Sequence, residues 1–377
     1  MNKKHYKLYS NCKYFPLDRP CIYQKNNNAL CPNCTHYTPV NKTSNVIKIL
    51  IIKLGAMGDV LRTTFILEGL KEKYKNVSID WLVEEKNKDT LVGNKFINNI
   101  IINDSKVFSF LTSNKYNIVI NLDLAPESLA FATLAMADKK IGYWLDENRK
   151  IKESNNYAKK WLLTSAYDTL KKENEHTYQY WMAKIAELPK DNYEIIVPVS
   201  KQAKQKAKNL NIPKNNKKII GINPSSSKRW KMKKWNLDKF IKLTKILSDK
   251  GYTILLLGGK EDEFEINKIL SKKIKNVYST GLNNSVQEFF AIINLCDIII
   301  CGDTMAMHAA LGLKKNVVAI FGPTSSNEIE MYNRGIKVIP KTCSCCYRQE
   351  CSKKITCMDE ISVDEVLTAI KNLRSNF

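Results

Sequence analysis

The amino-acid sequence predicts an α/β protein with two Rossmann-like parallel-sheet domains that face each other across a cleft. Two separate runs of alternating strand and helix patterns predict the two sheets. A lysine- and asparagine-rich stretch lies between these runs, and most of the eleven cysteines cluster near the two ends of the chain. We therefore expect a cysteine-rich module at 1–44, a first sheet domain at 45–190, a linker at 191–217, a second sheet domain at 218–340, and a cysteine-rich segment with a terminal helix at 341–377.

The first run begins with the apolar stretch VIKILIIKL at 46–54, which is typical of a buried strand. In GDVLRTTFILEGLKEKY at 58–74, apolar residues recur at helical spacing and predict a helix. Further short strands are expected at 77–85, 97–104 and 116–123. Strands that alternate with helices favour a parallel, doubly wound sheet.

The second run shows the same alternation more clearly. Polar or glycine-rich turns follow its strands, and ligands of open parallel sheets collect beyond the carboxyl ends of the strands. The sequence therefore predicts a nucleotide-diphosphate pocket in this half. The strands are expected at 218–226, 252–259, 276–281, 297–303 and 316–324, and the helices at 236–251, 261–273, 285–296, 304–313 and 362–377.

Several polar residues of this half have both a structural and a functional interpretation. Asp303 or Thr304 would cap the following helix or contact a phosphate. His308 lies one turn after Thr304 and would be either an interior histidine or part of the pocket. In SSSKRWKMKKW, the hydroxyls of Ser225, Ser226 and Ser227 and the amine of Lys233 would bind phosphate oxygens, or the stretch would be a solvated basic loop.

The turn GAMG at 55–58 matches neither the dinucleotide-binding fingerprint nor the phosphate-binding loop that ends in Lys and Ser or Thr. It places Asp59 at the start of a helix, where an acid either caps the helix or is presented to the interdomain cleft.

The stretches ILIIKLGAMGDVLRTTFIL and GDTMAMHAALGLKKNVVAIFGPTSSNEIEMY together resemble the ADP-heptose:lipopolysaccharide heptosyltransferases of glycosyltransferase family 9. The cysteine-rich ends resemble a cysteine-rich branch of that family. The resemblance implies the two-lobed GT-B fold, with an acceptor domain first and a nucleotide-sugar domain second. It also implies inverting transfer of a heptose, or a related sugar, from an ADP-sugar donor without a catalytic metal.

The resemblance implies roles for individual residues, with Asp59 as the general base that activates the acceptor hydroxyl. Gly55, Ala56 and Met305 depart from the family pattern and leave open which sugar is transferred. Diphosphate binding is expected from Lys233 and the serines at 225–227, sugar and phosphate contacts from Asp303, Thr304 and His308, a ribose contact from Glu261 or Glu263, an adenine contact from Asn284, and a further nucleotide-sugar contact from Lys53.

The clustered cysteines of a chain expected in a reducing compartment suggest structural metal sites. Zinc is expected, iron is an alternative at the C-terminal cluster, and His36 could replace one N-terminal ligand. Disulfide pairing is the alternative for both clusters. The expected ligands are Cys12, Cys21, Cys31 and Cys34 in the first cluster, and Cys343, Cys346, Cys351 and Cys357 in the second.

The formal net charge is +23, which indicates either an anionic partner or simply a lysine-rich composition. We expect a cytoplasmic protein, without a secretion signal or membrane helix, that acts on an anionic glycan or lipid-linked acceptor at the inner membrane face. No specific nucleic-acid partner is expected. The alternatives are a zinc-ribbon nucleic-acid-binding protein and a GT-B enzyme that uses a UDP-sugar.

Overall fold

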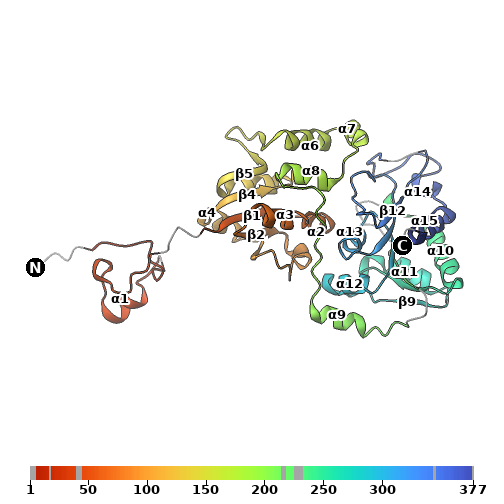
Figure 1. Ribbon diagram of the computed structural model, residues 1–377, viewed down its shortest axis with the longest axis horizontal. Helices are drawn as coiled ribbons and strands as arrows, with labels where there is room; N and C mark the ends of the chain where they lie inside the picture. Colours follow the sequence, from red (N-terminus) through yellow and green to blue (C-terminus); the bar gives the residue numbers. More distant parts are fainter. Residues whose placement is uncertain are drawn as a thin grey trace, which may run out of the picture. The chain divides into compact units, whose positions relative to one another are not determined.

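The computed structural model describes residues 6–16, 18–39, 45–213, 218–224, 232–342 and 345–375 of the chain (Figure 1). The chain forms two compact units, Met1–Val46 and Ile47–Phe377. The second unit contains two lobes, each built on its own six-stranded sheet. The predicted fold class is therefore confirmed.

The first unit has little regular structure. It contains helix α1 (Ile22–Asn27), the 3-10 turn η1 (Cys31–Asn33) and a β-bridge between Cys12 and Pro39. None of its described residues is buried, so no hydrophobic core forms among them. Instead, the Tyr23 ring stacks on His36 with centroids 4.0 Å apart and meets Tyr14 edge-on at 5.1 Å.

The N-terminal lobe of the second unit has the strand order β3-β2-β1-β4-β5-β6. The strands run parallel, except that β6 is antiparallel to β5. Its strands are β1 (Ile47–Ile52), β2 (Val77–Val83), β3 (Asn99–Ile102), β4 (Lys115–Asn121), β5 (Met136–Leu145) and β6 (Ile151–Glu153), and its helices are α2 (Met57–Thr63), α3 (Ile66–Lys73), η2 (Glu85–Thr90), α4 (Val107–Ser113), α5 (Pro126–Leu134), α6 (Asn156–Ala166), α7 (Asp168–Glu173) and α8 (Tyr178–Ile185).

The C-terminal lobe has the order β12-β11-β10-β7-β8-β9, and all of its neighbouring strands are parallel. Counted from its first strand, this is the same order as in the N-terminal lobe. Its strands are β7 (Ile219–Ile222), β8 (Thr253–Leu256), β9 (Val277–Ser279), β10 (Ile298–Gly302), β11 (Asn316–Ile320) and β12 (Gly335–Val338), and its helices are α9 (Lys201–Lys208), α10 (Leu237–Asp249), η4 (Lys260–Asp262), α11 (Glu263–Leu270), α12 (Val286–Ile293), α13 (Met305–Gly312), α14 (Cys357–Glu360) and α15 (Val363–Ser375).

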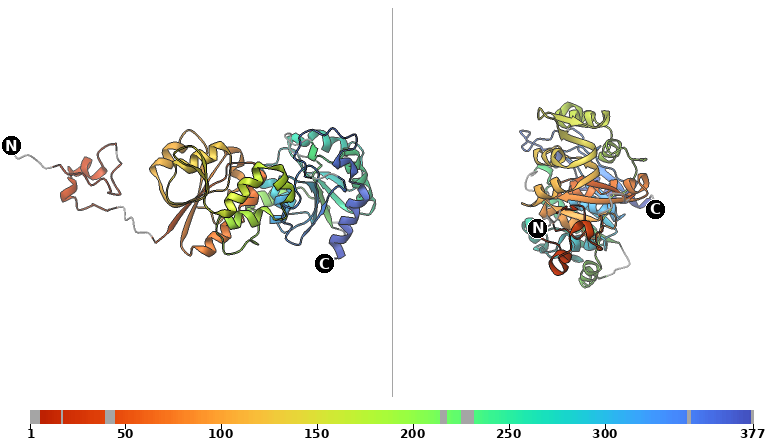
Figure 2. Two further views of the ribbon diagram at one scale, coloured as in Figure 1. Left: turned by 90° about the horizontal axis from the view of Figure 1, so that it is seen from above. Right: turned by 90° about the vertical axis from the view of Figure 1, so that its left-hand side faces the viewer.

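Helices cover both faces of each sheet (Figure 2). Consecutive residues of β1, such as Leu50 and Ile51, are fully buried because their side chains point to opposite, equally covered faces. This explains why the strand reads as a continuous apolar run rather than as an alternating one.

The helix predicted at 58–74 is interrupted, with α2 ending at Thr63 and α3 beginning at Ile66. The Thr64 hydroxyl donates to Leu61 O at 2.7 Å and accepts from Ile196 N at 2.9 Å. A contact with a segment more than 130 residues away therefore fixes the junction, and the local sequence does not reveal it.

Part of the predicted linker 191–217 is regular structure. Helix α9 begins at Lys201, and its Ala203 and Ala207 join the C-terminal core together with Phe289 of α12. Residues 214–217 lie outside the described part of the chain.

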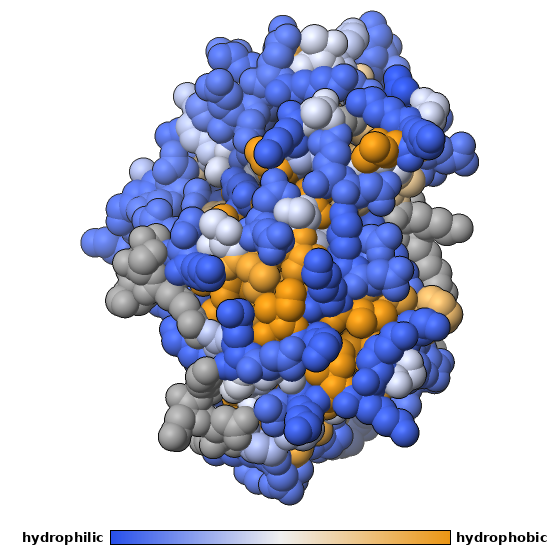
Figure 3. All heavy atoms as spheres, turned by 90° about the vertical axis from the view of Figure 1, so that its right-hand side faces the viewer, coloured by the Kyte–Doolittle hydropathy of each residue, from blue (hydrophilic) through white to orange (hydrophobic). Residues whose placement is uncertain are grey.

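Among the described residues, no helix is long and apolar enough to cross a membrane. Figure 3 looks onto one face of the molecule, where hydrophilic side chains predominate and apolar side chains gather near the middle.

Candidate active site between the two lobes

A pocket of about 660 Å³ lies between the two lobes of the second unit. This volume is in the range of small-molecule and cofactor sites. The turn into α2 contributes one wall, and the loops after β7, β8, β10 and β11 contribute the other. In each sheet, the pocket lies beyond the carboxyl ends of the strands, where ligands of doubly wound folds bind.

Asp59 lies in the first turn of α2 and lines this pocket. It does not cap the helix, because the N-cap is Ala56 and no side chain caps it. Among the described residues, the ion-pair partner of the Asp59 carboxylate is Arg62, whose Nη2 lies 2.9 Å from Oδ1. Burial opposes ionisation of Asp59, but the charges of Arg62 and Lys53 outweigh it and hold the pKa below its ordinary value.

Arg62 is the residue that fixes Asp59 in this position. Its guanidinium stacks on the Tyr178 ring of α8, with Cζ 3.8 Å from the ring centroid. Its Nε is buried and has no hydrogen-bond partner among the described residues. The pair is thus held by stacking and by its ionic contact, and both residues line the pocket.

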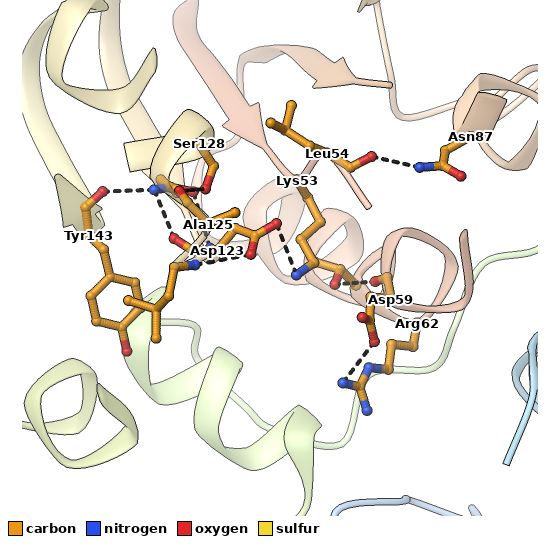
Figure 4. A network of polar contacts seen from close by, with 12 residues as sticks. Lys53, Leu54, Asp59, Arg62, Asn87, Asp123, Ala125, Ser128 and Tyr143 are labelled. Atoms are coloured by element: carbon orange, nitrogen blue, oxygen red, sulfur yellow. Dashed lines mark hydrogen bonds and ion pairs between the residues drawn. The ribbon is translucent and has the colours of Figure 1, made fainter. Parts of the chain in front are cut away.

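Lys53 lies directly after β1, but it is not among the described residues that line the pocket. It is 6% exposed, and its Nζ lies 3.4 Å from Asp123 Oδ2, at the end of β4 (Figure 4). The positive charge of Lys53 helps to lower the pKa of Asp59. The structure therefore places Lys53 where its charge acts on Asp59, and its contact with a nucleotide sugar stays a prediction.

The opposite wall carries a second lysine–aspartate pair. Lys233 Nζ lies 2.6 Å from Asp303 Oδ2, which also accepts a hydrogen bond of 2.9 Å from the Thr324 hydroxyl. Burial of Asp303 opposes its ionisation, but Lys233 and His308 hold its pKa below the ordinary value. A cation and hydroxyl groups so arranged can bind phosphate oxygens.

Thr304 is the N-cap of α13, although its side chain does not cap the helix. Its hydroxyl donates to Asn223 Oδ1 at 3.2 Å, which links the ends of β7 and β10. The first turn of α13 therefore faces the pocket with backbone N–H groups and the positive end of the helix dipole, which favour an anion.

His308 lines the pocket and is 5% exposed. Burial and the charge of Arg62 lower its pKa to about 4, so the ring is neutral near pH 7. It therefore offers a phosphate a hydrogen bond rather than a positive charge. A Cβ on Gly58 would lie 3.3 Å from His308 Cδ2, so the glycine allows α2 to approach α13 closely.

Glu261 and Asn284, which follow strands β8 and β9, are also lining residues. Glu263 is exposed and is not among the described lining residues, so of the two acids proposed for the ribose only Glu261 faces the pocket. Asn284 Nδ2 is engaged with the backbone oxygens of Thr280 and Gly281. Ser225, Ser226 and Ser227 lie outside the described residues.

The described cysteines form no disulfide. Within the described parts of the chain, no group of three or more His, Cys, Asp or Glu side chains is placed to hold a metal ion. The positions of Cys12, Cys21, Cys31 and Cys34 thus do not form the expected tetrahedral site. In the second cluster, Cys343 lies outside the described residues, whereas Cys357 is buried at the start of α14. The metal sites stay a prediction from the sequence.

Several lining residues were not predicted from the sequence. Arg62 carries a usable signal, because an arginine three positions after an acid on a helix pairs with it. The others have no local signal, since distant segments bring them together. They are Asn223, Thr324, Ser325, Glu328 and Tyr347.

The sequence of residues 105–357 matches the family model described as glycosyltransferase family 9 (heptosyltransferase). The chain is also similar to lipooligosaccharide heptosyltransferase 2 of Campylobacter jejuni subsp. jejuni serotype O:6. The two are 25% identical over 340 residues, which cover 87% of this chain and 99% of the relative.

Solved structures share the fold. A family 9 glycosyl transferase of Veillonella parvula aligns with a TM-score of 0.74 at 17% identity, covering 89% of this chain and 99% of that one. Escherichia coli ADP-heptose heptosyltransferase II aligns with a TM-score of 0.67 at 20% identity, covering 88% and 99%. E. coli heptosyltransferase WaaC with ADP-2-deoxy-2-fluoro heptose aligns with a TM-score of 0.60 at 16% identity, covering 86% and 99%. The chain has the GT-B architecture of these enzymes, and it belongs to glycosyltransferase family 9, the heptosyltransferases.

Proposed function

We propose that this protein transfers a heptose, or a closely related sugar, from an ADP-sugar to a lipopolysaccharide- or lipooligosaccharide-type acceptor, with inversion at the anomeric carbon. Family membership and the names of the relatives, a lipooligosaccharide heptosyltransferase and a heptosyltransferase with an ADP-sugar analogue, support the donor and the acceptor class. The single observation that carries the mechanism is the pocket in which Asp59 faces Lys233, Asp303 and Thr304 from the opposite lobe.

In the proposed reaction, Asp59 accepts the proton of the acceptor hydroxyl while the hydroxyl oxygen forms a bond to the anomeric carbon. The bond from that carbon to the diphosphate oxygen breaks on the opposite face, and ADP leaves. A base within hydrogen-bond distance of the nucleophile accelerates such a step. The Arg62 contact at Oδ1 fixes the carboxylate and keeps it ionised, which suits a base that must be free of its proton at neutral pH.

The opposite wall would stabilise the departing diphosphate. Lys233 supplies a positive charge, and the first turn of α13 supplies backbone N–H groups. A diphosphate that accepted from Lys233 would compete with Asp303 for the same amine. Thr324 would then hold the Asp303 carboxylate in place through its own hydrogen bond.

Asp59→Ala tests the assignment of the base. We expect transfer to fall by about 10²–10⁴-fold, the usual contribution of general base catalysis, while ADP binding measured by isothermal titration stays within about twofold. Glu68→Ala on α3 is a matched control, because this exposed acid is not among the described lining residues. An active Asp59→Ala enzyme would contradict the proposed mechanism.

Nucleotide choice separates this proposal from a UDP-sugar enzyme and from a nucleic-acid-binding protein. We expect ADP to raise the melting temperature of the purified protein, and UDP and RNA to have little effect. Stabilisation by UDP alone would support the first alternative, and salt-sensitive RNA binding the second. Transfer at the inner face of the cytoplasmic membrane stays a prediction.

A further inference from the structure

Two residues of the pocket have no role in the mechanism above. Glu328 follows β11 in the loop that also carries Thr324, and Tyr347 comes from the C-terminal cysteine-rich segment. Tyr347 Oη lies 2.9 Å from Glu328 Oε1 and donates to it. The same phenol oxygen accepts a hydrogen bond of 3.2 Å from Ser325 N.

The cysteine-rich segment is attached to the pocket wall by its backbone. Cys345 N donates to Gly322 O at 3.2 Å, and Tyr347 N donates to Pro323 O at 2.7 Å. Cys345 and Tyr347 both have positive φ angles, 57° and 51°. Such angles are unusual for residues with side chains and concentrate at functional sites. The segment is thus held in an unfavourable backbone conformation that brings one phenol into the pocket.

The position of Glu328 along the pocket indicates which part of a ligand it would meet. In the proposed donor orientation, Glu261 and Asn284 would contact the nucleoside, and they come from other loops. The charged groups that act on Glu328 are Arg62, Asp303 and Lys171, and burial raises its pKa. Glu328 therefore lies on the side of the pocket near Arg62, the ion-pair partner of Asp59. In a displacement with Asp59 as base, the transferred sugar occupies this side.

Among the described residues, only Tyr347 forms a side-chain hydrogen bond with Glu328. A carboxyl group has about four acceptor sites, so capacity remains for sugar hydroxyls. Lys171 of α7 reaches over the Tyr347 ring, with Nζ 4.9 Å from its centroid. The N-terminal lobe therefore also contacts this part of the wall.

We propose that Glu328, held by Tyr347, forms a subsite that recognises hydroxyl groups of the transferred sugar, so that the C-terminal cysteine-rich segment takes part in donor selection. This inference rests on the proposed use of an ADP-sugar. It goes further by giving Glu328 a binding role and Tyr347 a positioning role.

The test compares isothermal titrations with ADP alone and with ADP-2-deoxy-2-fluoro-heptose. We expect Glu328→Ala to weaken binding of the fluoro-sugar nucleotide about tenfold, the effect of one lost hydrogen bond to a charged group, while ADP affinity changes less than about twofold. Tyr347→Phe should weaken only the sugar nucleotide, by about threefold, because Glu328 remains but is no longer held.

Matched controls lie close by. Glu330→Ala removes an acid two positions away, and Tyr332→Phe removes a buried hydroxyl that bonds Gln179; neither residue is among the described lining residues. Both controls should bind the two nucleotides like the wild type.

Retained ADP binding shows that each variant is folded. Equal affinity of wild type and Glu328→Ala for the fluoro-sugar nucleotide would overturn this inference and leave the proposed function intact. An effect of Glu328→Ala confined to the KM of the acceptor would also overturn it. A wild-type protein that bound neither nucleotide would instead refute the proposed function.

Discussion

The two lobes share a strand order but use the same position in the sheet differently. Each places a lysine–aspartate pair after its first and fourth strands, Lys53 with Asp123 in the N-terminal lobe and Lys233 with Asp303 in the C-terminal lobe. The first pair is absent from the described pocket lining, whereas the second lines the pocket. The fold thus places a charged pair after the first and fourth strands of each sheet, and the position of that pair decides whether it lies behind the pocket wall or lines the pocket.

The largest expected effect on folding stability concerns His308. Its ring lies against Gly58 of the N-terminal lobe. Its pKa of about 4 in the folded chain lies below the ordinary value of 6.5, so the unfolded chain binds more protons between these values. This contribution to stability is therefore complete above pH 6.5 and is lost as the pH falls toward 4. The charged groups that act on the His308 ring are Arg62, Asp303, Asp59 and Lys233.

From these values, His308 should lower the free energy of unfolding by about 2 kcal/mol between pH 7 and pH 5. Urea denaturation at both pH values measures this, and His308→Asn should lose most of the difference. The control His176→Asn, at an exposed histidine, should show the same difference between pH 7 and pH 5 as the wild type. Equal acid sensitivity in wild type and His308→Asn would mean that the ring is not held neutral between the lobes.

The next effect tests the C-terminal pair. Lys233→Met should weaken ADP binding about 10–100-fold, because a charge-assisted contact to phosphate is lost and Asp303 keeps its negative charge without that lysine. Isothermal titration measures the change. Lys234→Met is the control, since Lys234 pairs with Glu265 and is not among the described lining residues. If both variants bound ADP equally well, the C-terminal pair would not hold the ligand.

A smaller and different effect is expected from the N-terminal pair. Lys53→Met should leave ADP affinity and turnover near neutral pH almost unchanged but lower turnover at acidic pH, since Lys53 helps to keep the pKa of Asp59 low. Removing this charge raises that pKa, so the acid limb of the pH–rate profile should move to higher pH. Weaker ADP binding in Lys53→Met would show that Lys53, like Lys233, contributes to nucleotide binding.

The smallest effect on catalysis is expected from the N-terminal cysteines. If they bind a structural metal, as their spacing predicts, elemental analysis of the purified protein should find zinc, and Cys31→Ser with Cys34→Ser should lower the zinc content by about one ion per chain. Turnover of the remaining chain should change less than about twofold, because these residues belong to a separate compact unit. A metal-free wild type would refute the first site, and Ala29→Ser is a neutral control.

The sequence alone determined the two sheets and much of the site, because these depend on local patterns. Buried parallel strands require continuous apolar runs, as in β1, and the turns that carry Asp59 and Asp303 come after the ends of strands β1 and β10. The role proposed for Asp59 came from the family resemblance, and its place in the pocket lining came from the structure.

Only the tertiary structure decided which residues meet across the pocket. The contact between Tyr347 and Glu328 and the ion pair of Lys53 with Asp123 depend on how loops from distant segments pack. The break between α2 and α3 likewise depends on Ile196. The physical reason is that helix and strand patterns reflect neighbours a few positions apart, whereas a binding site is made by side chains whose separation along the chain has no fixed period.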